Sequence, residues 1–195
     1  TAADSGYQVF KWIAFPGWNV EAHRYTAILP QAAVKLFKSF HAGLRTLLLV
    51  ASVSHVLVAY AVFVCCAHLM RAPRAAMATA LAAVLCTRLT FYGPVLEANY
   101  LLCFPFLFFG AIEQREQRSL GIADIVVLLL LAAFTLLVHP LGWLILAYGI
   151  LFLWSGGHLP LRSAGVLLGS MVLWGGVSRR LFPPTAYEVE QYAKL

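Results

Sequence analysis

Charge is scarce in this sequence. Only 11% of the 195 residues are charged, whereas 62% are hydrophobic and the mean hydropathy is +0.81. Average soluble domains are about half apolar and about a quarter charged. A soluble fold of this size could not bury so much apolar surface, so the composition predicts that lipid is the solvent for most of the chain.

The sequence also shows no cysteine spacing that is typical of metal binding or redox chemistry. The four cysteines lie in apolar runs without metal-ligand spacing, and we interpret them as small buried hydrophobic residues. The net charge of +6 comes without a nucleic-acid-binding motif. We therefore expect no nucleic acid partner, and we assign the excess of positive charge to segments that face anionic membrane lipids.

The chain lacks an initial methionine and a secretory signal. It begins with Thr1 in a polar stretch that has no charged start followed by an apolar run. We expect the sequence to be a fragment of a longer polypeptide in which another span comes first. A processed N-terminus is the alternative interpretation.

The hydrophobic runs predict an all-α, polytopic transmembrane helix bundle of about six spans. The bundle is expected over residues 46–182, with spans at about 47–69, 75–90, up to 112, two within 122–154, and 161–177. His139-Pro140 divides the run 122–154, because proline disfavours helix at the preceding residue. Each half is too short to cross a hydrocarbon core of about 30 Å, so we expect this turn to be recessed in the membrane. Gly165 and Gly169 form a small-xxx-small step that suggests close helix packing.

The first 45 residues form the only sizeable segment outside the spans. They contain many aromatic residues, and the stretch Pro30 to Leu44 has an amphipathic pattern in which Leu36, Phe37 and Phe40 share a face. Lys35 and Lys38 are expected to snorkel from the edge of that face. We predict an extracytoplasmic loop with interfacial helices over 1–45, and the start of a further extracytoplasmic loop over 183–195. The raw count of Lys and Arg points to the opposite orientation and does not settle it.

Few acidic residues are placed where they could do chemistry. Glu113 is expected to be solvated, and Asp124 sits where an acid favours a helix N-terminus. Asp4 can be a general base or simply a helix-capping or turn residue. Glu97 follows a Gly-Pro turn, and we expect it to lie near His139 in space.

Three polar side chains lie close together at Glu21, His23 and Arg24. An arginine there suits a phosphate, because its planar fork binds two oxygens at once. A surface ion pair of little energetic worth is the alternative. Histidines inside the spans, such as His55, are expected to be hydrogen-bonded within the bundle rather than catalytic.

The layout resembles the GT-C superfamily of polytopic membrane glycosyltransferases. The acidic stretch around Asp4, the segment 21–31 before an interfacial helix, the short loop 91–97 and the turn 137–141 carry this resemblance. It implies transfer of a hexosyl or pentosyl group from a polyprenyl-phosphate-linked sugar at the extracytoplasmic face, in a bacterial inner (plasma) membrane. It also implies that Asp4 is the catalytic base, although the family often shows two adjacent acids where Asp4 stands alone.

The same resemblance implies the roles of the other site residues. Arg24 and His23 would contact the donor phosphate, and Glu21, Glu97 and His139 would complete the substrate-binding site. Some members bind a divalent metal, but no ligand set in this sequence demands one. A membrane transporter or channel, and a non-enzymatic membrane scaffold subunit, remain as alternatives. Broken helices favour a transporter, but the spans lack paired ionisable groups at depth.

Overall fold

The computed structural model describes residues 2–20, 25–85, 98–115, 120–138 and 142–181, together with Pro183 and Val189. Within this part of the chain the side chains of residues 2–6, Ala27 and Arg179 are not described. Every regular element in the described residues is a helix and none is a strand. The prediction of an all-α fold is therefore confirmed for these residues.

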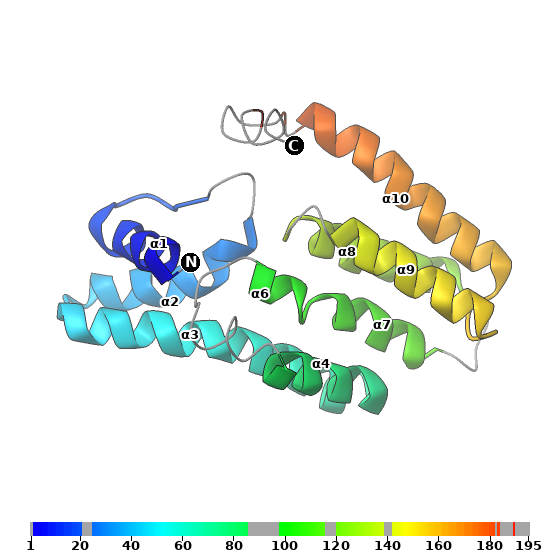
Figure 1. Ribbon diagram of the computed structural model, residues 1–195, viewed down its shortest axis with the longest axis horizontal. Coiled ribbons are helices and arrows are strands. Elements are labelled where there is room, and N and C mark those ends of the chain that lie inside the picture. The colour runs from blue at the N-terminus through cyan, green and yellow to red at the C-terminus, as the bar shows by residue number, and fades with distance from the viewer. Residues whose placement is uncertain are drawn as a thin grey trace.

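The helices follow the order of the predicted segments (Figure 1). At the N-terminus they are α1 (Ala2–Ala14), the short turn η1 (Tyr25–Ala27) and α2 (Ile28–Ser39). The long helix α3 (Leu44–Val64) continues into the π-helical turn η2 (Cys65–Leu69) and is followed by α4 (Pro73–Leu85). The remaining helices are α6 (Ala98–Leu101), α7 (Pro105–Glu113), α8 (Ile122–Leu136), α9 (Gly142–Ser155) and α10 (Leu161–Leu181).

Two helical stretches are long and apolar enough to cross a membrane. They are Leu44–Leu69, with a mean hydropathy of 2.4, and Leu161–Ser178 within α10, with a mean hydropathy of 1.2. Three further helices, α4, α8 and α9, are apolar but have only 13, 15 and 14 residues. Length and composition thus support membrane association most directly at the first and last predicted spans.

The run 122–154 forms two helices, as its His139-Pro140 step predicts. α8 ends at Leu136 and α9 begins at Gly142, while residues 139–141 lie outside the described part of the chain. The predicted third span is itself interrupted. The short helix α6 ends at Leu101, and α7 begins afresh at Pro105, whose ring is compatible with the first position of a helix.

Three groups of buried apolar residues hold the helices together. Phe108, Leu128, Leu146 and Leu167 belong to a core shared by α7, α8, α9 and α10. A second core joins α3, α4, α6 and α7 around Phe104. A third core is smaller and lies at the other end of α3, where Trp12, Val34, Leu47 and Ala51 pack together. This third core attaches α1 and α2 to the rest of the molecule (Figure 1).

Large apolar side chains also cover the outside of the long helices. Leu49 on α3 is 64% exposed, and Leu173 on α10 is 72% exposed. Gly165 and Gly169 lie on an open face of α10, because a Cβ added at either position meets nothing within 4 Å. The prediction that this glycine pair packs closely on a neighbouring helix is therefore wrong within the described residues. The surface of the bundle is suited to an apolar solvent.

The amphipathic helix predicted near Pro30 is present as α2. Its buried face carries Pro30, Gln31 and Val34, which pack on α1 and α3. The apolar residues expected to share a face, Leu36, Phe37 and Phe40, point outward and are 55%, 41% and 72% exposed. The exposed apolar side is thus available to lipid, as an interfacial helix requires.

Candidate functional site

None of the six predicted site residues has a described side chain. Asp4 lies in the first turn of α1, where an acid favours the helix N-terminus, but only its backbone is described. The other five lie outside the described residues: Glu21, His23, Arg24, Glu97 and His139. The contacts predicted among them are therefore not tested by this structure. The described residues around the N-terminal helices form a distinctive polar environment.

Buried polar side chains gather where α2 packs on α3, and in the adjoining turn η1. Among the described residues, the buried polar side chains here are Thr26, Gln31, Ser54 and His55. The two found elsewhere, Thr79 and Thr135, donate to the carbonyls four residues earlier in their own helices. Such local bonds satisfy a hydroxyl without any other partner. We call the first group, together with Tyr100, the polar seam.

Gln31 fastens the linker between α1 and α2 to the polar seam. Its side-chain Nε2 donates to the carbonyl of Asn19 at 2.6 Å, and its Oε1 accepts the Asn19 N–H at 2.9 Å. The Asn19 side chain in turn donates to Oε1 of Gln8 on α1. Gln31 is completely buried, so these bonds offset the cost of removing an amide from water. Gln31 and Asn19 together therefore connect α2 to α1.

His55 and Tyr100 form the deepest polar contact of the seam. The Nδ1 atom of His55 lies 2.9 Å from the Tyr100 hydroxyl, and both residues are almost fully buried. The prediction that His55 is hydrogen-bonded inside the bundle is confirmed. The preceding residue, Ser54, donates to the carbonyl of Ala51 and also lies 3.4 Å from the carbonyl of Pro30. Ser54 thus connects α3 to the start of α2, and His55 connects α3 to α6.

Two buried polar atoms, one in the seam and one on α1, have no hydrogen-bond partner among the described residues. They are Nε1 of Trp12, on α1, and Oγ1 of Thr26, in η1. Trp12 is only 1% exposed and Thr26 only 3%. An unsatisfied buried donor costs about 1–3 kcal/mol, so each position is suited to a water molecule or to a polar group of a ligand.

Two lysines of α2 hold the C-terminal end of α1. Lys35 Nζ donates to the carbonyl of Phe15, and Lys38 Nζ donates to the carbonyl of Ile13. These carbonyls belong to the end of a helix, where backbone acceptors lack partners and the helix dipole favours cations. Both lysines, predicted to snorkel from the edge of the apolar face, direct their amino groups to these carbonyls. Burial, and secondarily the charge of Lys38, lowers the pKa of Lys35 below its usual value.

Carboxylates at the opposite end of the bundle have structural roles. Both oxygens of Glu113 accept backbone N–H groups at the start of α4, from Arg74 at 3.1 Å and Ala75 at 2.9 Å. The prediction that Glu113 is simply solvated is therefore wrong. The partners lie 38 and 39 positions away, so no local pattern could indicate them.

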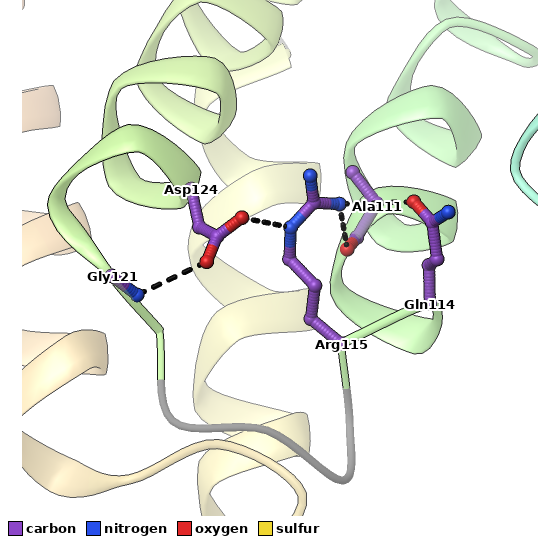
Figure 2. Close-up of polar contacts among 5 residues, drawn as sticks. All are labelled: Ala111, Gln114, Arg115, Gly121 and Asp124. Atoms are coloured by element: carbon purple, nitrogen blue, oxygen red, sulfur yellow. Dashed lines mark hydrogen bonds and ion pairs between the residues drawn. The ribbon is translucent and has the colours of Figure 1, made fainter.

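Asp124 links the end of α7 to the start of α8 (Figure 2). Its Oδ2 accepts the Gly121 N–H at 3.0 Å, and its Oδ1 accepts from Nε of Arg115. Arg115 also donates through Nη1 to the carbonyl of Ala111 and to the Gln114 side chain. The prediction that Asp124 favours a helix N-terminus is confirmed.

The polar seam contains an amide, hydroxyls and an imidazole, and none of its five members is an acid. In the described part of the chain, no three His, Cys, Asp or Glu side chains lie together in a way that could hold a metal ion. An amide, hydroxyls and an imidazole can bind the hydroxyl groups of a sugar or the oxygens of a phosphate. Sequence reasoning missed Gln31, Ser54 and Tyr100, although a glutamine on the buried side of an amphipathic helix is a signal that could have been used.

Comparison with known proteins adds no relative. No protein-family model, curated protein or solved structure matches the chain.

Proposed function

We propose that this protein is a polytopic membrane glycosyltransferase of the GT-C type, with its site at the end of the bundle where α1 and α2 are attached. In this proposal α3 with η2, α4, α6 with α7, α8, α9 and α10 make six crossings. The exposed apolar side chains along these helices and the two helices long enough to span a bilayer support membrane residence.

The polar seam is the observation that carries the proposal. Of the described buried polar side chains, those not satisfied within their own helix lie at this end. Gln31, Ser54 and His55 have hydrogen-bond partners, whereas a buried polar atom without one is costly unless water or a ligand supplies it. The unsatisfied atoms of Trp12 and Thr26 both lie in the N-terminal unit, which comprises α1, the linker after it, η1 and α2. A ligand rich in hydroxyl groups would supply what they lack.

In the proposed mechanism the carboxylate of Asp4 takes a proton from the acceptor hydroxyl. Arg24 and His23 stabilise the departing polyprenyl phosphate, since charge develops there during transfer. Glu21, Glu97 and His139 bind the sugar in this proposal. The exposed aromatic rings of the N-terminal unit, such as Phe10 and Trp18, would rest in the extracytoplasmic surface of a bacterial inner membrane.

The decisive experiment measures transfer of a labelled sugar from polyprenyl-phosphate donors in membranes that contain the full-length protein. We expect Asp4→Asn to lower the transfer rate by about 100-fold to about 10,000-fold, because a general base contributes on that order. Asp4→Glu retains a carboxylate and should keep part of the activity. Full activity in Asp4→Asn would exclude Asp4 as the base.

A second measurement separates this proposal from its main competitor. Purified protein in liposomes should show no flux of solute across the bilayer if it is a transferase. Solute flux together with absent sugar transfer would replace the proposal with a transporter.

A further inference from the structure

An apolar cavity of about 290 Å³ lies between α8 and α10. Its lining includes Leu129, Ala133 and Leu136 on α8, and Leu173 and Val177 on α10. These spacings of three or four positions place each set on one face of its helix. Leu173 is 72% exposed and Val177 is 47% exposed, so the cavity is an open groove on the outer surface of the bundle. We call it the α8–α10 groove.

The C-terminal end of α10 has the features of a segment at the level of lipid headgroups. The part of α10 that is apolar enough to cross a membrane ends at Ser178. Trp174 lines the groove one turn before this limit, and tryptophan is enriched where a membrane meets water. Arg180 is exposed and lies two positions after the limit. We therefore expect its guanidinium to reach the headgroups of lipids around the bundle.

Arg180 continues the row of side chains with which α10 lines the groove. It follows Leu173 by seven positions and Val177 by three, so all three residues lie on one side of α10. The Cβ atoms of a helix tilt towards its N-terminus, so the side chain of Arg180 leads back towards the turn of Val177. The two Cα atoms are separated by about 4.5 Å along the helix axis. Arg180 thus lies at the C-terminal end of the groove.

No acid with a described side chain offsets the charge of Arg180. The carboxylates that the structure describes are those of Glu113 and Asp124, which accept from the starts of α4 and α8. Because α8 and α10 run in the same direction, Asp124 and Arg180 lie at opposite ends of these helices (Figure 1). The ion pair within the described residues joins Asp124 to Arg115 instead. A cation at the end of an apolar groove is complementary to an anionic amphiphile.

We infer that the α8–α10 groove binds one hydrocarbon chain of an anionic phospholipid, with the lipid phosphate at Arg180. A guanidinium binds two phosphate oxygens through parallel hydrogen bonds and stays charged at all relevant pH values. Lipid chains surround the whole bundle, so apolar contact alone does not distinguish one lipid from another. Selection of an anionic lipid therefore depends on Arg180, while the groove holds the chain by packing from both helices.

The test compares two lipids that share their hydrocarbon chains but differ in headgroup charge. Full-length protein would be reconstituted with phosphatidylglycerol and phosphatidylcholine, and the retained lipid would be counted by native mass spectrometry. We expect phosphatidylglycerol to be retained preferentially, and Arg180→Gln to weaken its binding about tenfold, equivalent to about 1.4 kcal/mol. Arg162→Gln removes an exposed arginine at the other end of α10 and should leave binding unchanged.

A second pair of variants tests the binding of the chain. Ala133→Phe places a ring in the groove and should abolish retention of phosphatidylglycerol while leaving Arg180 in place. Ala133→Ser adds a single atom at the same position and should retain the lipid. Thermal unfolding in detergent shows whether the Ala133→Phe protein is folded. Arg180→Gln changes an exposed position and is expected to fold, so the inference stays testable without the larger substitution.

Four results would each overturn the inference. They are equal retention of the two lipids, unchanged binding in Arg180→Gln or in folded Ala133→Phe, complete displacement by inorganic phosphate, and preference for a polyprenyl phosphate over phosphatidylglycerol. Displacement by phosphate would indicate a simple anion site, and the last result would assign the groove to the proposed sugar donor. The inference depends on membrane residence but not on transferase activity. Selective retention in a protein that transfers no sugar would therefore still support it.

Discussion

Single carboxylates in this protein serve as caps for helices. Glu113 accepts from the start of α4, and Asp124 accepts from Gly121 at the start of α8. The first four N–H groups of a helix have no partner inside it, and an acid supplies one while also favouring the helix dipole. The capping role of Asp124 could be predicted from the sequence because its partner, Gly121, lies three residues away. The capping role of Glu113 could not be predicted, because its partners belong to another helix.

Two substitutions at Asp124 should show separately how much each of its two contacts contributes to stability. Asp124→Asn keeps an oxygen for the Gly121 N–H but loses the charge that pairs with Arg115. The pair is partly exposed, so we expect a loss of at most about 1 kcal/mol from the free energy of unfolding. Asp124→Ala also removes the cap and should cost about 1 kcal/mol more. Denaturant unfolding in detergent measures both, and equal losses would contradict the role of the cap.

Lys35 should give the stability of the protein a dependence on alkaline pH. Burial and the charge of Lys38 lower its pKa in the folded state from the ordinary 10.5. Between these two pKa values the unfolded chain binds more protons than the folded one, so the free energy of unfolding rises with pH. We expect this rise on approaching about pH 10. Lys35→Arg, which stays charged, should show a smaller slope in unfolding measurements, and an identical slope would contradict the assignment.

At the scale of the helix, side chains distant in sequence decide what each element contacts. The apolar period of α2 could be predicted, but its orientation could not. Leu36 and Phe37 face outward, while Gln31 turns inward because the backbone of Asn19 offers it two bonds. Lys35 and Lys38 likewise turn towards the end of α1. A helical period identifies a face but not the partner of that face.

Glycines on two helices should respond in opposite ways to the same substitution. Gly149→Ala on α9 forces the added Cβ into the Phe109 ring, so we expect a loss of about 1–3 kcal/mol in stability. Gly169→Ala on α10 meets nothing within 4 Å and should be neutral or stabilising by up to about 1 kcal/mol. Thermal unfolding in one detergent compares the two variants. A stable Gly149→Ala protein would show that the ring is free to move away.

At the scale of the whole molecule, the sequence predicted helices, their order and several of their limits. Leu44–Leu69 matches the expected span 47–69, and α8 and α9 divide the run 122–154 as proline predicts. Interfacial helices were expected within 1–45, but the limits of α1 could not be predicted, since Asp4, Ser5 and Gly6 are poor helix formers that hide its start. Its attachment depends on Trp12 and on the α2 lysines, and such distant contacts are not visible in a local pattern.

The six-crossing arrangement predicts that Ser5 and Gln114 face opposite sides of the membrane. Three crossings separate them, through α3 with η2, α4, and α6 with α7. In a full-length protein without its native cysteines, Ser5→Cys should react with an impermeant thiol reagent in intact cells. Gln114→Cys, at an exposed position, should react only after lysis.

The two other outcomes of this labelling have clear meanings. Labelling of both positions from one side would rule out the six-crossing arrangement. Reversed labelling would keep the arrangement but place Asp4 in the cytoplasm. The glycosyltransferase proposal would then be abandoned.

The lysine contacts between α2 and α1 have a mechanical consequence. Lys35 and Lys38 bind the C-terminal end of α1, and Gln31 binds Asn19 in the linker between α1 and α2. Val34 packs α2 against α3. These contacts join α1, the linker and α2 to α3, so α1 can separate from α3 only when several of them break together.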